Sequence, residues 1–269
     1  MTNPSLVFIG LGLYDEKDIT IKGLEEIKKS EKIFAEFYTA RLMGSSINKL
    51  EELFGKKIQV LTRQQTEEGK QIIESALKQK TAFLTAGDPM TATTHVDLRI
   101  RAVQKGIKTK VIHGNSIISA VPGLLGLQNY KFGRATTMVY PEKNYFPTSP
   151  YEIIKKNKEN GFHTLLLLDI KDDEKRYMTA NEAMKLLLGY EEKLRSGLFS
   201  DESIICVIAR AGSEKPVVKS GMIMDLIDLD YGEPLHTMVI PGRLHFMEIE
   251  ALMVLAQLPA QQGEKLQKN

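Results

Sequence analysis

Short hydrophobic runs alternate with amphipathic segments along the first half of the chain. Apolar runs of three to five residues predict buried strands, and apolar residues recurring every three or four positions predict helices. The strands predicted in this way are 6–9, 32–35, 58–61, 82–84 and 109–112, and the helices are 19–29, 46–54, 67–79 and 93–105. Strands without polar alternation between helices are typical of a largely parallel sheet covered on both faces.

The second half has a different texture, with longer and more varied connections. Strands are predicted at 135–139, 164–170, 204–209 and 236–240. Thr179 and Glu182 form the sequence signature of a capping box, so a helix should begin there. A last helix is predicted over 244–258, stopping before Pro259. We therefore expect an α/β domain over 1–113, a second over 114–259 and a loose polar tail over 260–269.

Composition adds little beyond solubility. The 269 residues carry a formal net charge of +2, which gives no electrostatic reason to expect nucleic-acid or membrane partners. The single cysteine, Cys206, lies in an apolar run and should be core filler in a reducing compartment. No apolar run approaches the roughly 18 residues of a membrane span, and the first residues lack signal-peptide character. A cytoplasmic protein is expected.

The sequence lacks several motifs that identify common active sites. These are the GxxxxGK[ST] phosphate loop, HExxH, CxxC and the GxSxG nucleophile elbow. No metal site is expected. Gly10 and Gly12 form a GxG turn after the first strand, but Tyr14 and Asp15 stand where a dinucleotide fingerprint would continue. The missing third glycine, and the lack of an acidic residue at the usual place, disfavour a nicotinamide oxidoreductase. The alternative is a plain strand-to-helix turn.

Two further turns follow strands of the first half. Gly87-Asp88-Pro89 is either a ligand-binding loop or a common helix-starting device. Ser116, after Gly114, is either an N-cap or part of an anion site at a helix start. Because the carboxyl ends of parallel strands share one edge of a sheet, the three glycine turns should converge there.

Two features of the second half give weaker evidence for ligand binding. Small residues end a strand at 209–213, which suggests close approach of a ligand to the backbone. His236 is one of five histidines, and a lone histidine is more often a structural hydrogen-bonder than a ligand contact.

Several stretches, taken together, resemble the tetrapyrrole-methylase-like, or class III, methyltransferases. They also resemble the members of that family that modify translation elongation factor 2. The stretches are FIGLGLYDEKDIT (8–20), FAEFYTA (34–40), FLTAGDPMTATTH (83–95), NYKFG (129–133), YFPTSPY (145–151), HTLLLLDIK (163–171), YMTANEAM (177–184), ARAGS (209–213) and VIPGRLH (239–245). The resemblance extends from about residue 6 to 258.

This resemblance implies two α/β domains, the first with a mainly parallel sheet and the second with a mixed sheet, with S-adenosylmethionine in the cleft between them. It implies a homodimer, and an acceptor that is the histidine of elongation factor 2 carrying a 3-amino-3-carboxypropyl group. The amino nitrogen would be methylated repeatedly, in diphthamide biosynthesis. The implied cofactor contacts are Leu13, Asp88, Thr91, Ser116, Ile117, Leu168, Ala211 and His236.

The chain departs from the family pattern in two places. The segment 122–126 is built differently, which affects the edge of the implied cleft. Thr91 stands where an aliphatic residue is common, so its contact would be through the backbone.

Methyl transfer from a sulfonium to an amine requires alignment and removal of the amine proton, and no metal. We assign no general base, and Asp88 is disfavoured because it belongs to the implied cofactor turn. Lys171, Arg176 and Arg210 are candidates to hold the acceptor's carboxylate, although Lys171 is as easily read as part of a surface ion pair. The alternatives are a methyltransferase acting on a tetrapyrrole ring and a non-catalytic nucleotide-sensing module.

Overall fold

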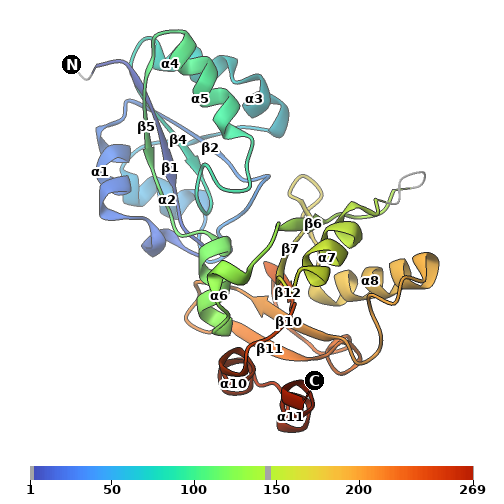
Figure 1. The fold of residues 1–269 in the computed structure, drawn as a ribbon. Coiled ribbons are helices and arrows are strands. Elements are labelled where there is room, and N and C mark those ends of the chain that lie inside the picture. The colour runs from blue at the N-terminus through green and yellow to red at the C-terminus, as the bar shows by residue number, and fades with distance from the viewer. Residues whose placement is uncertain (1–2, 143–146, 269) are drawn as a thin grey trace. The chain divides into compact units, whose positions relative to one another are not determined.

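A computed structural model describes residues 3–142 and 147–268, which form two compact α/β units (Figure 1). The first unit contains residues 1–117 together with two short segments, 172–174 and 212–214, and the second contains the rest of the chain. The chain thus leaves the first unit just after the predicted boundary at residue 113. The stretch 145–151 begins outside the described residues.

The first unit is built on a parallel five-stranded sheet. Its strands, in spatial order, are β3 (Gln59–Val60), β2 (Lys32–Glu36), β4 (Lys80–Thr85), β1 (Ser5–Gly10) and β5 (Lys108–Ile112). The other elements are η1 (Glu16–Asp18), α1 (Ile21–Lys29), α2 (Ile47–Phe54), α3 (Arg63–Glu68), α4 (Lys70–Ala76) and α5 (His95–Gln104).

Both faces of this sheet are buried, which explains why its strands read as continuous apolar runs. Val7 and Ile9 of β1 pack in one core with side chains of α1 and α2. Leu6 and Phe8 point the other way and pack with side chains of α4 and α5. The predicted covered parallel sheet is therefore confirmed. Thr20 caps α1, its hydroxyl accepting from the Gly23 N–H.

The predicted helix over 67–79 is wrong in its extent, because Gly69 divides the segment into α3 and α4. Gly69 has a φ of 64° and ends α3 in the left-handed conformation that glycine adopts without strain. A Cβ there would lie 2.6 Å from the Leu98 Cδ1 atom. Periodicity extends through this break, so only the glycine marks it.

The second unit contains a mixed sheet, as the resemblance implies. Its order is β11 (Val217–Met222), β10 (Ile204–Ala209), β12 (His236–Ile240), β7 (Thr164–Leu168) and β6 (Thr136–Met138). Only the β6–β7 pair is parallel. A small antiparallel hairpin is formed by β8 (Ile170–Lys171) and β9 (Arg176–Tyr177). Cys206 is fully buried in β10, as expected.

Helices α7 (Ser149–Glu159) and α8 (Ala180–Leu194) contribute to the main core of this unit. The predicted capping box opens α8, with Thr179 and Glu182 each accepting from the other's backbone N–H. The remaining helical elements are α6 (Ile117–Leu125), η2 (Asn129–Lys131), α9 (Ile223–Leu226) and α10 (Phe246–Leu255).

The tail differs from its prediction. Residues that the sequence suggests are loose form α11 (Ala260–Lys268), which packs against α10. Gln262 explains why these residues are ordered as a helix. Its Nε2 atom donates to Asp225 Oδ2 over 2.7 Å, and its Oε1 atom accepts from the Met222 N–H. In the described parts of the chain, no helix is long and apolar enough to cross a membrane.

Candidate functional site

Three glycine turns converge at the carboxyl edge of the first sheet. Gly12 and Gly87 form an isolated bridge, in which the Gly87 N–H donates to the Gly12 carbonyl over 2.6 Å. A Cβ on Gly114 would lie 2.3 Å from the Gly87 carbonyl oxygen, and one on Gly10 would lie 2.6 Å from the Gly114 nitrogen. The backbones therefore pack directly on one another, as the sequence predicts.

The turn after Gly12 is held by a carboxylate that sequence reasoning did not single out. Asp18 Oδ2 accepts from the N–H groups of Leu13, Tyr14 and Asp15, at 3.2, 2.7 and 3.3 Å. Gly12 has a φ of 84°, which turns the chain towards Asp18. Because its N–H is engaged, Leu13 has only its carbonyl and side chain for a ligand.

Asp88 ties the second turn to the third. Its Oδ1 atom accepts from the Met90 N–H at 2.8 Å and from the Thr91 hydroxyl at 3.2 Å. Its Oδ2 atom lies 2.7 Å from His113 Nδ1 and accepts from the Gly114 N–H at 3.3 Å. The side chain is 6% exposed, so this carboxylate is occupied within the protein and organises the edge.

Ser116 and Ile117 lie at the start of α6, after the Gly114 turn. Both are half-buried. The backbone amides of a first helical turn have no partner within the helix, which makes such a position suitable for an anionic or polar ligand group.

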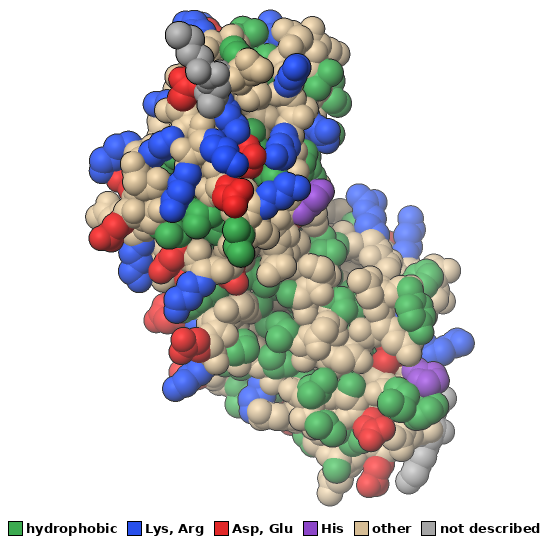
Figure 2. All heavy atoms as spheres, turned by 90° about the vertical axis from the view of Figure 1, so that its left-hand side faces the viewer, with side chains coloured by type: hydrophobic (Ala, Val, Ile, Leu, Met, Phe, Trp, Pro, Cys, Tyr) green, Lys and Arg blue, Asp and Glu red, His purple; other side chains and the backbone are tan. Residues whose placement is uncertain are grey.

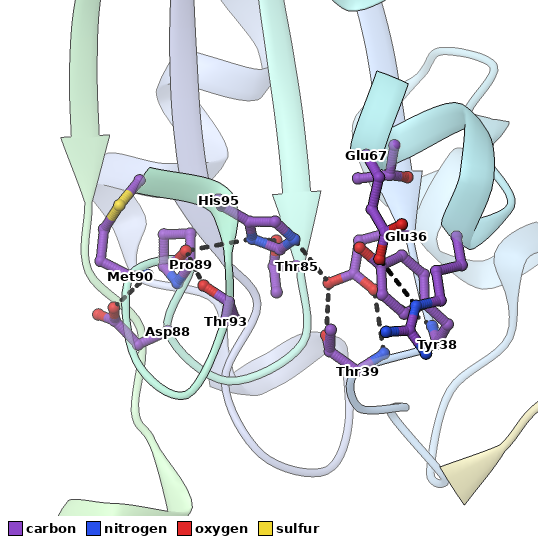
Figure 3. Close-up of polar contacts among 12 residues, drawn as sticks. Glu36, Tyr38, Thr39, Glu67, Thr85, Asp88, Pro89, Met90, Thr93 and His95 are labelled. Carbon is purple, nitrogen blue, oxygen red and sulfur yellow. Dashed lines mark hydrogen bonds and ion pairs between the residues drawn. The ribbon is translucent and has the colours of Figure 1, made fainter. Parts of the chain in front are cut away.

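A buried carboxyl–imidazole pair lies at the same sheet edge (Figure 3). Glu36 ends β2, and its Oε2 atom accepts from the N–H groups of Tyr38 and Thr39, both at 3.1 Å. His95, the first residue of α5, places its Nε2 atom 3.6 Å from Glu36 Oε1. Burial raises the pKa of Glu36 to about 7 and lowers that of His95 to about 4.

The predicted cofactor contacts of the second unit also lie at one edge of its sheet. Leu168 ends β7, Ala211 follows β10 by two residues, and His236 begins the antiparallel β12 opposite Ala209. His236 is engaged within the protein: its Nδ1 atom accepts from the Ala180 N–H at 3.2 Å, and its Nε2 atom lies 3.1 Å from the Gly232 carbonyl oxygen. Both ring nitrogens of His236 thus have partners within the protein.

Two of the three candidate cations come together on the small hairpin. Lys171 and Arg176 are register partners across β8 and β9. The Arg176 guanidinium carbon lies 3.6 Å from the centre of the Tyr140 ring, and Lys171 Nζ lies 5.8 Å from it. Arg176 also lies 3.6 Å from a Glu182 carboxylate oxygen. Both cations thus contact the same aromatic ring.

Arg210 is used differently. Its Nη1 atom donates to the carbonyl oxygens of Tyr231 and Glu233, at 2.7 and 2.8 Å. The residue has a φ of 53°, an unusual conformation for a residue other than glycine. Because one guanidinium arm fastens the 231–233 loop, we regard Arg210 as a structural residue first.

Some of the distinctive sequence stretches meet away from these edges. Glu248 of α10 accepts from His163 Nε2 at 3.0 Å and from the Gln128 N–H at 2.9 Å, and it pairs with Lys131. Burial would raise the pKa of the Glu248 carboxyl, but these bonds and one from the His245 N–H hold it at about 2. The stretches around 129–133, 163 and 239–245 therefore share a structural network.

Asp18, His113, Glu36 and His95 are the edge residues that sequence reasoning missed. One signal was available for Glu36, since a charged residue within the apolar run 33–37 needs a buried partner. Nothing local identifies His95 as that partner. Within residues 3–142 and 147–268, no three His, Cys, Asp or Glu side chains gather as a metal ion would require.

Comparison with known proteins gives concordant results. Residues 5–226 match the family model of the Tetrapyrrole (Corrin/Porphyrin) Methylases. The chain is 55% identical to the diphthine synthase of Methanocaldococcus jannaschii, covering 94% of this chain and 99% of that protein. It is 51% identical to the diphthine synthase of Methanothermobacter thermautotrophicus, covering 97% and 99%.

Solved structures are similar over the same extent. A crystal structure of diphthine synthase has a TM-score of 0.87 and 40% identity, covering 96% of this chain and 98% of that one. The crystal structure of a putative diphthine synthase from Entamoeba histolytica has a TM-score of 0.86 and 39% identity, covering 95% and 100%.

Proposed function

We propose, given that the chain belongs to the tetrapyrrole methylase family and is an S-adenosylmethionine-dependent methyltransferase, that its acceptor is the modified histidine of translation elongation factor 2. The enzyme methylates the amino group of the 3-amino-3-carboxypropyl substituent repeatedly, giving diphthine in diphthamide biosynthesis. The reaction takes place in the cytoplasm, where translation factors act.

One observation carries this proposal: identity of 50–55% to diphthine synthases across nearly the full length of both chains. A match to the methylase family alone would fit a tetrapyrrole acceptor equally well. The similarity instead continues through the second unit to α10, beyond the end of the family match at residue 226.

The edge residues fit a methyl donor. We assign Leu13, Asp88, Thr91, Ser116 and Ile117, the contacts that the resemblance implies in the first unit, as residues that hold it. Gly87 has a φ of 73°, and a Cβ built on it would meet no atom within 4 Å, so space is open beside the turn. The turns present backbone groups at this edge, which suit the polar amino-acid and ribose parts of S-adenosylmethionine. Asp88 acts by shaping the turn.

S-adenosylmethionine, when bound, supplies a methyl group that its sulfonium charge has already activated. The chain's own residues have to align the acceptor, exclude water and receive a proton. Alignment alone lowers such barriers by roughly 7–11 kcal/mol. Asp88 is a poor proton acceptor, since both its oxygens are already engaged by backbone N–H groups, the Thr91 hydroxyl and His113.

The acceptor also carries a carboxylate. Lys171 and Arg176, side by side over Tyr140, are the two cations that we assign to hold it, because arginine can bind a carboxylate through two parallel bonds. Arg210, the third candidate, contributes by fastening its loop.

The reaction is tested by intact-mass analysis of elongation factor 2 carrying the unmethylated precursor, before and after incubation with enzyme and donor. We expect gains in steps of about 14 mass units, the mass that a methyl group adds when it replaces hydrogen. Factor with an unmodified histidine is the matched control and should gain nothing. No gain on the precursor, or a spectral change on titration with uroporphyrinogen-like anions, would favour a tetrapyrrole acceptor or a sensing module.

The carboxylate assignment predicts that K171A/R176A weakens acceptor binding at least tenfold, as expected for two charge-assisted bonds. Affinity for S-adenosylhomocysteine should stay unchanged. K185A, an exposed lysine of α8, is the matched control. Fluorescence anisotropy with labelled acceptor measures the affinity. If the triple variant K171A/R176A/R210A bound the acceptor as tightly as the wild type, the assignment of these cations to the acceptor's carboxylate would be wrong.

A further inference from the structure

The pair of Glu36 and His95 has no role in the assignments above (Figure 3). The Glu36 side chain is fully buried, and that of His95 is 2% exposed. They join two turns at the carboxyl edge: Glu36 receives the N–H groups of Tyr38 and Thr39, and His95 contacts the carbonyl of Pro89, in the turn that contains Asp88. The pair therefore lies between the 36–39 turn and a turn assigned to the methyl donor.

The hydrogen bonds fix where the imidazole carries its proton. His95 Nδ1 lies 3.2 Å from the Pro89 carbonyl oxygen, which can only accept. Nδ1 therefore carries hydrogen, and in a neutral ring Nε2 is a lone pair. That Nε2 atom is buried, has no hydrogen-bond partner within normal distance, and lies 3.6 Å from Glu36 Oε1.

Two lone pairs facing each other in a buried site would repel. A proton between the two atoms removes the repulsion, and the Glu36 carboxyl can carry it, because its Oε1 atom lies 3.6 Å from Nε2. The surroundings favour the neutral form of this pair over an ion pair, because Phe83 packs edge-on to the imidazole at 5.0 Å and water is excluded. The Thr39 hydroxyl still donates to the same Glu36 oxygen, at 2.5 Å.

We propose that Glu36 carries a proton directed at His95 Nε2, and that this proton makes the pair a positioning device for the 87–91 turn. The inference rests on the proposed role of that turn in holding the methyl donor. His95 is the link, since it bonds to the Pro89 carbonyl that Thr93 also contacts, at 2.9 Å.

The pKa directions agree with this geometry. With the pKa of Glu36 at about 7 and that of His95 at about 4, both groups are neutral near pH 6. Above about pH 7 Glu36 loses its proton, the two acceptors face each other, and the turn loses part of its anchorage. The other ionisable groups near the pair or its turn are Tyr38, Arg63, Glu67, Asp88 and His113.

The first test is calorimetric titration of the intact enzyme with S-adenosylhomocysteine from pH 6 to pH 9. We expect the affinity of the wild type to fall about three- to tenfold across pH 7, the equivalent of one ordinary hydrogen bond. E36Q replaces the acid proton with a permanent amide N–H donor, so it should retain the pH 6 affinity throughout. H95F, which cannot bond to Pro89, should bind weakly at every pH.

H113N is the control for the histidine that contacts Asp88 of the turn, and the pH dependence should persist in it. An affinity of the wild type that does not change with pH, or an E36Q profile that follows the wild type, would overturn the proposal.

The second test does not depend on ligand binding. Nitrogen-15 spectra of histidine-labelled wild type should show His95 as a neutral ring with hydrogen on Nδ1 at pH 6. Hydrogen on Nε2, or an imidazolium, would contradict the proposal even if E36Q failed to fold. Absence of S-adenosylhomocysteine binding at every pH would instead count against the proposed methyl-donor site, and the spectra would still decide the state of the pair.

Discussion

Gly114 shows how strongly a single residue constrains the candidate site. A Cβ there would overlap the Gly87 carbonyl oxygen, and backbone cannot move aside as a flexible side chain can. We expect G114A to lower the free energy of unfolding by about 2 kcal/mol or more, because the converging turns must shift.

Gly123 is the matched control. It lies within α6, and a Cβ built on it meets nothing within 4 Å. G123A should therefore be neutral or stabilise by up to about 1 kcal/mol. Urea denaturation of the two variants compares them directly, and equal stability would show that the turns adapt to the added methyl group.

Individual residues also show what the sequence can and cannot reveal about the site. Gly10, Gly87 and Gly114 were found because each follows a recognisable strand, and parallel strands share a carboxyl edge. The Glu36–His95 pair was not found from the sequence, because its two members belong to different elements that are far apart in the chain. The pairing of β2 with β4 brings them together. Contacts made by tertiary structure leave no local pattern.

Among secondary-structure elements, Glu26 of α1 joins the helix to two strands of the first sheet. Its carboxylate pairs with Lys80 of β4 at 2.6 Å and with Lys110 of β5 at 2.9 Å. The hydrogen bond from Lys80, aided by Lys110 and opposed by burial, lowers the pKa of Glu26 to about 2.

The sign of the pH effect follows from this lowered pKa. The unfolded chain binds the proton more tightly, so the stabilisation is complete above about pH 4.5 and is lost as the pH falls towards 2. We expect E26Q to be about 1–3 kcal/mol less stable than the wild type at pH 7, with the difference shrinking below pH 4.5.

E25Q is the matched control, because Glu25 is exposed and its pair with Lys29 is a weak surface contact. Guanidinium denaturation between pH 2.5 and 7 provides the measurement. A constant difference between E26Q and the wild type at all pH values would contradict the assigned pKa.

Elements differ in how well their sequences predict them. The strands of the first sheet were predictable because burial on both faces leaves continuous apolar runs. β11 was not predictable, because its central residues, Lys219, Ser220 and Gly221, lack an apolar pattern. The strand is formed by pairing with β10. α11 depends in the same way on tertiary contacts, through Gln262.

For the assembled protein, we expect a homodimer, as the sequence resemblance implies. Figure 2 shows hydrophobic side chains gathered on the surface of the second unit with few charges among them. Phe246, Met247 and Val254 of α10 are 60%, 51% and 73% exposed, which supports burial of this helix against a second copy.

Light scattering tests this expectation. V254E should shift the wild-type dimer towards monomer, because a charge in an apolar interface is left without a partner. I21E alters a hydrophobic residue on α1 that is 80% exposed, and it should leave the mass unchanged. A monomeric wild type would contradict the dimer, and an unaffected V254E dimer would exclude α10 as its contact.

The backbone-on-backbone packing of Gly10, Gly87 and Gly114 also limits how the proposed methyl-donor site can be redesigned. No side chain can be introduced at Gly10 or Gly114 to enlarge, narrow or recharge it, since there is no room there for even a methyl group. At Gly87 there is space, but its φ of 73° disfavours any other residue. Variants intended to accept donors with bulkier alkyl groups on sulfur should therefore leave the glycines intact. Diversity is better introduced at Leu13, Ser116 and Ile117, where side chains border the same edge.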